Sequence, residues 1–188
     1  MLTYTGTREI LTDRLTLRRF LLSDAEQMFQ NYAADGRVTR FLTWEPYKSV
    51  EGVRAFLIGM MEEYRHKDYY HWAMEWEGQI IGSISVTALD EKNGCCEVGY
   101  CIGYDYWNRG FTTEALKAVM GFLFLDVNMH RITAKHDTEN PASGAVMKKC
   151  GMKVEGRLRE HYCRHDGSYG DAVVYGILKK EFLGGAGE

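Results

Sequence analysis

The stretch of sequence that decides the fold is YDYWNRGFTTEA, from Tyr104 to Ala115. It joins an apolar stretch that predicts a strand to a helical pattern that begins near Thr112. The first amides of a helix have no partner within it, and the helix dipole favours negative charge beside them, so this turn can bind an anion. Gly110 lets a phosphate approach the backbone without a Cβ in the way, and Arg109 can add positive charge. A plain strand–turn–helix connection with a capping threonine explains the same pattern.

The spacing of glycines excludes two common classes of phosphate-binding turn. A P-loop requires Gly-x-x-x-x-Gly-Lys-Ser/Thr, and a dinucleotide-binding turn requires Gly-x-Gly-x-x-Gly; the sequence contains neither pattern. A phosphate-bearing ligand other than ATP or NAD is therefore favoured.

Upstream of this turn, the hydrophobic pattern predicts both strands and helices. Alternating residues and tight turns at Glu77-Gly78 and Asn93-Gly94 predict a meander of three strands, over residues 71–76, 79–87 and 95–104. Nearer the N-terminus we expect a strand through Leu15, Leu17 and Phe20, a helix from about Asp24, an aromatic loop over 37–48 and a helix over 49–66. The first of these helices should carry Met28, Phe29 and Tyr32 inward.

Downstream of the turn, a helix over about 112–128 and a strand over 131–136 are expected. Asn140-Pro141 predicts the start of a short helix that Gly151 ends. Two closing strands, 152–157 and 172–178, should flank a polar loop at 164–170, and residues 183–188 are expected to form a frayed tail. No repeat or linker divides the chain, so we expect a single α+β domain over residues 1–188.

Charge and hydropathy exclude several classes of partner. The 23 Lys and Arg residues against 26 Asp and Glu residues leave a net charge of −3, which provides no general attraction to nucleic acid or anionic lipid. The longest apolar stretch, 119–127, is broken by Gly121 and Asp126 and is far shorter than the ~20 residues that span a bilayer. Arg8 and Glu9 lie where a secretion signal would be apolar. We therefore expect a cytoplasmic protein with no nucleic-acid or membrane partner.

The cysteines do not indicate a disulfide framework or a zinc site. Their number is five, and no Cys-x-x-Cys pair occurs. The stretch from His161 to His165 brings three potential ligands together but has no fourth partner at a known spacing. We expect free thiols, a solvated hairpin at this stretch and no bound metal.

Several motifs follow one another in order over about nine-tenths of the chain. They are Glu97–Ile102, Tyr106–Ala115, Asn140–Ser143 and Lys149–Met152, with an opening Thr12–Arg18 and an ending Glu155–Glu160 plus Asp171. Together they resemble the GNAT superfamily of N-acetyltransferases, and within it the branch that acetylates the N-termini of ribosomal proteins. The resemblance implies a mixed, mostly antiparallel central sheet of about seven strands flanked by about four helices. It also implies transfer of an acetyl group from acetyl-coenzyme A to an amine.

The resemblance assigns roles in coenzyme binding to individual residues. The diphosphate would be held through the backbone amides of a loop made of Asn108, Arg109, Gly110, Phe111, Thr112 and Thr113. The pantetheine arm would be bound like a short added strand by Tyr100, Cys101 and Ile102, and Asn140 would contact the coenzyme from a helix start. Two residues depart from the family pattern: Trp107 replaces a Gln or Arg, and Thr112 replaces a Gly or Ala.

Direct transfer needs a base for the amine and a proton for the departing thiolate. Glu97 is the candidate base because it lies on the strand that would carry the thioester; an ion pair or an exposed strand residue is the structural alternative. Many family members take the proton from a tyrosine where this chain has Met147, so Ser143 is the candidate donor. A first-turn helix serine that bonds its own backbone is the alternative for Ser143. For Tyr100 and Tyr106, packing is favoured over a catalytic role.

The acceptor amine is less constrained. Trp44 and Trp72 are candidates to line its site, although aromatic residues at such places also occur as core. A peptide or protein N-terminus is the leading acceptor, and a polyamine or an aminoglycoside is the alternative, with Glu62, Glu63, Glu75 and Glu77 as candidate contacts. A non-catalytic acyl-CoA-binding module and a Cys163/His161 hydrolase are competing functions. A homodimer is one expected assembly.

Overall fold

The computed structural model describes residues 1–164 and 167–184. The strands within these residues are β1 (Ile10–Leu11), β2 (Thr16–Arg18), β3 (His71–Trp76), β4 (Gln79–Asp90), β5 (Cys95–Ile102), β6 (Arg131–Asp137), β7 (Lys153–Cys163) and β8 (Tyr169–Leu178). The α-helices are α1 (Ala25–Met28), α2 (Gly36–Thr39), α3 (Val50–Glu63), α4 (Phe111–Leu125), α5 (Pro141–Lys149) and α6 (Lys179–Gly184). Three short turns of other helix types are η1 (Leu22–Asp24), η2 (Phe29–Ala33) and η3 (Tyr104–Tyr106).

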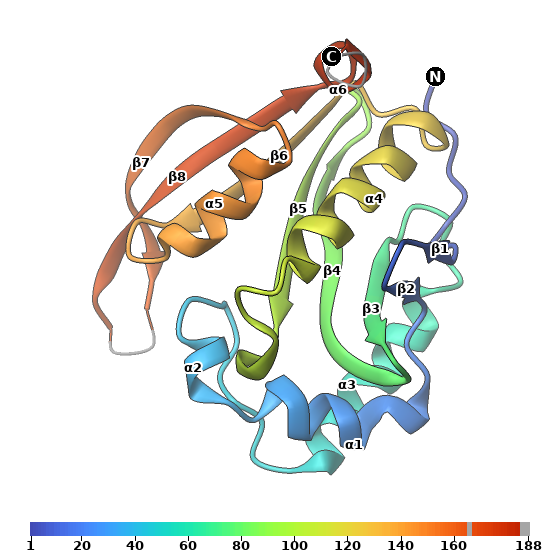
Figure 1. Cartoon of the computed structure of the whole chain (residues 1–188), viewed down its shortest axis with the longest axis vertical. Helices are drawn as coiled ribbons and strands as arrows, with labels where there is room; N and C mark the ends of the chain where they lie inside the picture. Colours follow the sequence, from blue (N-terminus) through green and yellow to red (C-terminus); the bar gives the residue numbers. More distant parts are fainter. Residues whose placement is uncertain (165–166, 185–188) are drawn as a thin grey trace. The chain divides into compact units, whose positions relative to one another are not determined.

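The strands follow the order β1-β2-β3-β4-β5-β6-β8-β7 (Figure 1). The β5–β6 pair is parallel, whereas β1–β2, β2–β3, β3–β4, β6–β8 and β7–β8 are antiparallel. The expected mixed α/β fold with a mostly antiparallel sheet is therefore confirmed. The described residues contain eight strands where about seven were expected, because the sequence pattern did not reveal the two-residue strand β1.

The internal contacts of the chain divide it into two compact units. The N-terminal unit consists of Tyr4–Ser85 and Tyr100–Ala118, and the C-terminal unit of Met1–Thr3, Val86–Gly99 and Val119–Glu188. The elements β4, β5 and α4 each contribute residues to both units.

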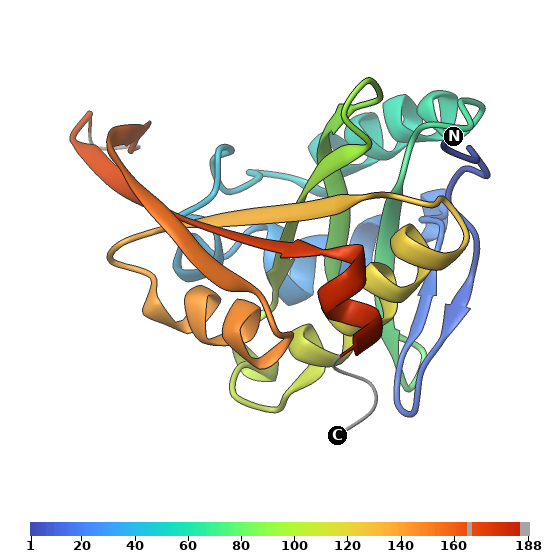
Figure 2. The same ribbon diagram turned by 90° about the horizontal axis from the view of Figure 1, so that it is seen from above.

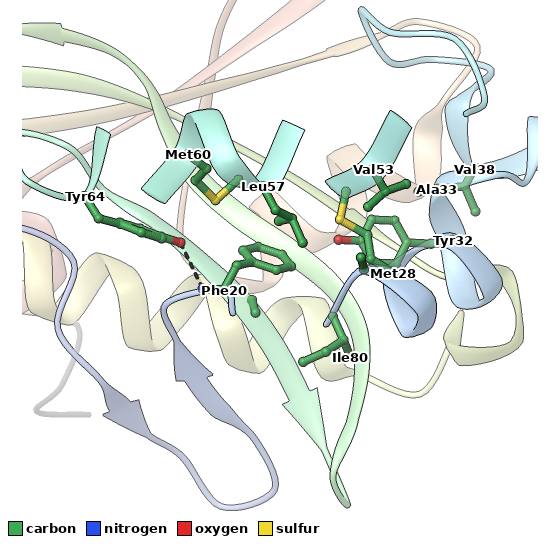
Figure 3. Close-up of a cluster of buried hydrophobic side chains, with 12 residues drawn as sticks. Phe20, Met28, Tyr32, Ala33, Val38, Val53, Leu57, Met60, Tyr64 and Ile80 are labelled. Carbon is green, nitrogen blue, oxygen red and sulfur yellow. Dashed lines mark hydrogen bonds between the residues drawn. The ribbon is translucent and has the colours of Figure 1, made fainter. Parts of the chain in front are cut away.

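Buried apolar side chains from α1, η2 and α3 form the core of the N-terminal unit (Figure 3). Ser49 caps α3 by accepting a hydrogen bond from the Gly52 amide (3.3 Å), and the helix then buries Val53, Leu57 and Met60 at three- and four-residue spacing. At its end the Tyr64 hydroxyl accepts a hydrogen bond from the Phe20 amide (3.1 Å), drawn as a dashed line in Figure 3. The predicted helix over 49–66 is thus present with slightly shorter bounds.

The segment from Leu22 to Thr39 differs from the expected helix followed by a loop. Met28 and Tyr32 are buried as predicted, but the backbone passes from η1 through α1 into a π-helical turn at η2. The region expected as an aromatic loop begins with α2, because the Asp35 carboxylate accepts a hydrogen bond from the Arg37 amide (2.8 Å) and caps a short helix.

In the C-terminal unit, β6 pairs with β8 and β8 with β7, the first residues of β5 pair with the other edge of β6, and α5 lies along β6 (Figure 1). The β6–β8 register runs from Arg131 opposite Leu178 to Asp137 opposite Ala172. Gly144 permits the close approach of α5, because a Cβ at this position would lie 2.5 Å from Nε2 of His136. Met147, on the same helix, is 1% exposed and belongs to the core.

The β7–β8 hairpin is longer than the sequence pattern predicted. Strand β7 extends to Cys163 instead of ending near Arg157, and β8 begins at Tyr169. A register shift occurs between Leu158 and Tyr162, where the Asp171 carboxylate accepts a hydrogen bond from the Glu160 amide (2.8 Å). The remaining part of the expected polar loop includes residues 165–166, which lie outside the described residues.

Helix α6 follows β8 directly (Figure 2). The Phe182 ring packs against Phe124, with ring centroids 5.2 Å apart. Leu183 and Gly184, which the sequence assigned to a frayed tail, are the last residues of α6, and residues 185–188 lie outside the described part of the chain. No helix in the described residues is long and apolar enough to cross a membrane.

Candidate functional site

The turn between β5 and α4 contains two residues with positive φ. Asn108 and Gly110 both have positive φ, 59° and 82°, and the Gly110 carbonyl accepts the first bond of α4 from the Glu114 amide (3.1 Å). Asn108, Arg109 and Gly110 are exposed, and a Cβ at Gly110 would meet only Nη2 of Arg14, at 3.4 Å. The predicted strand–turn–helix connection is present, with an open surface at its glycine.

Aromatic packing and burial hold two side chains of this loop, Arg109 and Phe111. Phe111 is 1% exposed, so its side chain belongs to the core and only its backbone amide remains for a ligand. The Arg109 guanidinium lies over the Trp76 ring at 4.5 Å and over the Phe111 ring at 5.1 Å, which keeps a positive charge beside the turn. Tyr106 packs edge-on against Trp76, in agreement with a packing role. Thr112 and Thr113 are half-buried in the first turn of α4.

Trp107, one of the two departures from the family pattern, has a structural role. Its indole Nε1 donates a hydrogen bond to the Ile102 carbonyl (2.9 Å), the last residue of β5. This bond occupies one of the two lone pairs of a carbonyl that was expected to bind pantetheine.

Strands β4 and β5 approach closely in the N-terminal unit, next to the residues expected to bind pantetheine. A Cβ at Gly82 would lie 2.4 Å from the Cys101 carbonyl oxygen, so only glycine fits there. The Cys101 thiol lies 3.4 Å from the Ser83 hydroxyl, and burial raises the pKa of this thiol. Tyr100, Cys101 and Ile102 are all half-buried, which leaves part of each residue accessible.

Glu97 lies in the C-terminal unit and is paired. Its carboxylate is 3.2 Å from Nζ of Lys135 and accepts a hydrogen bond from the Thr87 hydroxyl at 3.3 Å. The ion pair considered as the structural alternative is therefore present. The nearby Tyr162 has a raised pKa, first because of burial and then because of the negative charges of Glu97 and Asp137.

Asn140 and Ser143 lie at the start of α5, also in the C-terminal unit. The side-chain oxygen of Asn140 accepts a hydrogen bond from the Ser143 amide (3.3 Å), and Pro141 occupies the first helical position. Asn140 thus caps the helix whose start Asn140-Pro141 predicted. The Ser143 side chain is half-buried, and the buried Met147 offers no hydroxyl group to assist it.

The two tryptophans proposed as acceptor-lining residues differ in exposure. Trp72 is fully buried, stacks on Tyr70 and donates a hydrogen bond from Nε1 to the Arg8 carbonyl (2.6 Å). It therefore belongs to the core and cannot line an open site, which corrects that expectation. Trp44 is half-buried and packs against Tyr47, so part of its ring remains accessible.

The polar groups that sequence reasoning missed are Thr12, Arg14 and Glu114. The Glu114 carboxylate accepts hydrogen bonds from the Thr12 hydroxyl (2.6 Å) and from Nε of Arg14 (2.7 Å). Arg14 also donates to the Arg109 carbonyl within the loop (2.9 Å). These residues belong to motifs that carried the family resemblance, but contacts across about 100 positions leave no local signal in one sequence.

The cysteine and histidine candidates Cys163 and His161 can be located in the described part of the chain. Within residues 1–164 and 167–184, no three His, Cys, Asp or Glu side chains are grouped so that they could hold a metal ion. Cys163 and His161 are exposed on β7, and His165 lies outside the described residues.

Comparisons with known proteins place these features in a family. A family model described as an acetyltransferase (GNAT) domain matches residues 14–153. The uncharacterized N-acetyltransferase YoaA of Bacillus subtilis (strain 168) is 34% identical over 170 residues, which cover 89% of this chain and 95% of YoaA. The [ribosomal protein uS5]-alanine N-acetyltransferase of Escherichia coli (strain K12) is 27% identical over 186 residues, covering 94% and 93%.

The fold comparison agrees with the sequence comparison. The crystal structure of the GNAT-family acetyltransferase from Bacillus anthracis matches with a TM-score of 0.79 and 25% identity, covering 92% of this chain and 99% of that one. The family match spans the β5–α4 turn, Glu97 and the start of α5. The chain belongs to the GNAT family of acetyltransferases.

Proposed function

We propose that this chain transfers the acetyl group of acetyl-CoA to a primary amine by direct attack in a ternary complex, and that the β5–α4 loop binds the diphosphate of the coenzyme. The observation that carries this proposal is the exposed turn with positive φ at Asn108 and Gly110, which leads directly into α4. Consecutive backbone amides in such a turn can point toward one anion. The backbone at Gly110 is exposed, and a Cβ there would meet only Nη2 of Arg14, at 3.4 Å, so the residues present fit a diphosphate.

Each part of the loop has a distinct task in this proposal. The amides of Gly110, Phe111, Thr112 and Thr113 donate hydrogen bonds at the positive end of α4. Arg109, held over Trp76, adds charge without itself having to be ordered on binding. The exposed Asn108 begins the turn, and the backbone of Tyr100, Cys101 and Ile102 binds the pantetheine arm.

Glu97 and Ser143 are the proposed catalytic residues of the C-terminal unit. The coenzyme supplies an activated thioester, and the chain must remove a proton from the amine and protonate a thiolate. Lys135 and Thr87 orient the Glu97 carboxylate, which accepts the proton directly or through one water. The Ser143 hydroxyl donates a hydrogen bond to the sulfur, while Asn140 fixes the helix turn that carries it.

We propose a peptide or protein N-terminal amine as the acceptor. In its favour, the E. coli relative is named for the alanine of a ribosomal protein. The carboxylates considered for a polycationic acceptor are partly neutralised within the N-terminal unit: Glu75 pairs with Arg18 at 2.5 Å, and Glu62 with Arg65 at 2.8 Å. This pairing disfavours a polyamine or an aminoglycoside.

The test is a thiol-release assay with acetyl-CoA and a matched set of acceptors. The set comprises peptides that begin with Ala or Ser, the same peptides with a blocked N-terminus, a polyamine and an aminoglycoside. We expect free coenzyme A only with the unblocked peptides, and mass spectrometry should show one acetyl group on the terminal amine. Release of coenzyme A with the polyamine or the aminoglycoside instead would show that the acceptor is a small amine. Coenzyme binding without release under every condition would support the non-catalytic module.

A further inference from the structure

A cluster of hydrogen bonds connects the β1–β2 turn to the β5–α4 loop within the N-terminal unit. The Glu114 carboxylate, in the first turn of α4, accepts from the Thr12 hydroxyl (2.6 Å), the Arg14 amide (2.8 Å) and the Arg14 guanidinium (2.7 Å). The Glu114 side chain is 18% exposed. Burial alone would raise the pKa of Glu114, but the hydrogen bonds from Thr12 and Arg14 outweigh burial and lower it. The carboxylate is therefore charged and fully engaged.

Arg14 uses another of its N–H donors on the loop itself. Its Nη1 donates to the Arg109 carbonyl (2.9 Å), and its guanidinium lies 4.4 Å from the centre of the Phe111 ring. Arg14 thus contacts the loop on both sides of Gly110. The turn that presents Arg14 is itself fixed, because the Thr12 hydroxyl accepts from the Leu15 amide (2.9 Å).

The direction of one peptide group follows from this contact. The carbonyl of Arg109 and the N–H of Gly110 belong to the same planar trans peptide, so they point in opposite directions. A guanidinium that holds the carbonyl therefore directs the Gly110 N–H away from Arg14. Glycine populates several backbone conformations at similar energy, so this peptide could rotate if the carbonyl were released.

We propose that Arg14 and Glu114 are positioning residues for coenzyme binding: Glu114 holds Arg14, and Arg14 holds the Arg109–Gly110 peptide in the orientation that binds the coenzyme diphosphate. This inference rests on the function proposed above. It gives the contact between two distant segments, Thr12–Arg18 and Tyr106–Ala115, a function in coenzyme binding. A role in stability alone would not require that function. Binding of the coenzyme diphosphate should depend on Arg14 and Glu114, whereas binding of the pantetheine arm should not.

The experiment compares acetyl-CoA with S-acetylpantetheine, which lacks the diphosphate, in steady-state kinetics of the full chain. The variants are Arg14→Gln, Arg14→Lys and Glu114→Gln. Arg54→Gln is the matched control, because Arg54 is 45% exposed and paired with Glu26 on helices away from the loop, while Arg14 is 43% exposed. Thermal unfolding of each variant confirms that it is folded at the assay temperature.

We expect Arg14→Gln to raise the KM for acetyl-CoA about tenfold, the weight of one charge-assisted hydrogen bond, with kcat changed less than about twofold. The kcat/KM for S-acetylpantetheine should equal that of the wild type. Arg14→Lys keeps the charge but not the planar fork that reaches Glu114 and the Arg109 carbonyl together, so it should restore little. Glu114→Gln should also raise the KM for acetyl-CoA. Arg54→Gln should leave the kinetics with both substrates unchanged.

Three results would overturn the inference: an equal loss for both substrates, no loss for either, or full rescue by Arg14→Lys, which would indicate long-range charge alone. Failure of the proposed function has a different signature. If Gly110→Val leaves acetyl-CoA binding intact, the loop is not the diphosphate site and the inference falls with it. If Gly110→Val weakens binding and Arg14→Gln does not, the loop assignment stands and only the positioning role is removed.

Discussion

Replacement of Gly110 by valine tests the anion-binding loop at its narrowest point. Gly110 has a φ of 82°, a conformation that costs an L-residue about 1–2 kcal/mol, so Gly110→Val should lose about this much unfolding free energy. The valine side chain would also crowd the Arg14 guanidinium, because its Cβ would lie 3.4 Å from Nη2 of Arg14. If one charge-assisted hydrogen bond to the diphosphate is lost, about 1.5–3 kcal/mol of binding free energy disappears, or about 10- to 150-fold in affinity.

The matched control is Gly78→Val. Gly78 has a φ of 74°, lies in the β3–β4 turn and has no atom within 4 Å of its Cβ position. A valine at position 78 therefore introduces similar backbone strain at a position outside the β5–α4 loop. Isothermal titration with coenzyme A gives the affinity of each variant, and urea unfolding gives its stability. We expect similar losses of stability, but weakened coenzyme binding only in Gly110→Val. Equal affinities in the two variants would refute the assignment of the loop.

Three further predictions concern catalysis and pH. Glu97→Gln should lower kcat by about 10²-fold or more with the KM for acetyl-CoA nearly unchanged; an unaltered kcat would show that Glu97 is only an ion-pair partner. Ser143→Ala should lower kcat about tenfold, the contribution of one hydrogen bond, without weakening coenzyme binding in a titration; a change confined to affinity would assign Ser143 to binding. Burial lowers the pKa of His71 from 6.5 to about 4, so His71 should not change the free energy of unfolding above pH 6.5. Below this pH the unfolded chain binds the proton first, and the free energy of unfolding should fall by up to about 3 kcal/mol as the pH drops to 4. Urea unfolding across this range should show a flatter profile for His71→Gln; parallel profiles would contradict the assignment.

Elements with a strong local pattern could be predicted from the sequence. Strand β3 has the predicted bounds, because His71 to Trp76 lie between a helix end and the tight turn at Glu77-Gly78. Helix α5 was also recognised, since Asn140-Pro141 and Gly151 mark its two ends, and Gly151 has a φ of 82°. In these segments the local backbone preference and the final fold agree.

Elements stabilised by distant partners could not be predicted in the same way. The middle of β7 is exposed and polar, so no apolar alternation marks it as a strand; pairing with β8 and the Asp171 carboxylate hold it. The two-residue strand β1 is too short for a periodic signal. The helix expected from about Asp24 is instead the short α1 followed by a π-helical turn at η2, a local change that residue spacing does not encode.

In the candidate site, too, local features could be predicted from the sequence and contacts with distant residues could not. The turn at Asn108 and Gly110 was recognisable because glycine, a helix start and a preceding strand lie together in the sequence. The burial of Trp72 was not recognisable, because aromatic residues occur both in cores and in binding sites, and only the packed neighbours decide. The contact of Arg14 with Glu114 joins residues about 100 positions apart, so a single sequence cannot reveal it.

The central claim is that backbone amides between Asn108 and Thr113 bind the coenzyme diphosphate. A crystal structure of the chain with coenzyme A tests it most directly. We predict diphosphate oxygens about 2.7–3.2 Å from the amide nitrogens that follow Arg109, with Arg14 still bound to the Arg109 carbonyl. A coenzyme whose diphosphate lies elsewhere, with this turn in contact only with solvent or side chains, would contradict the account.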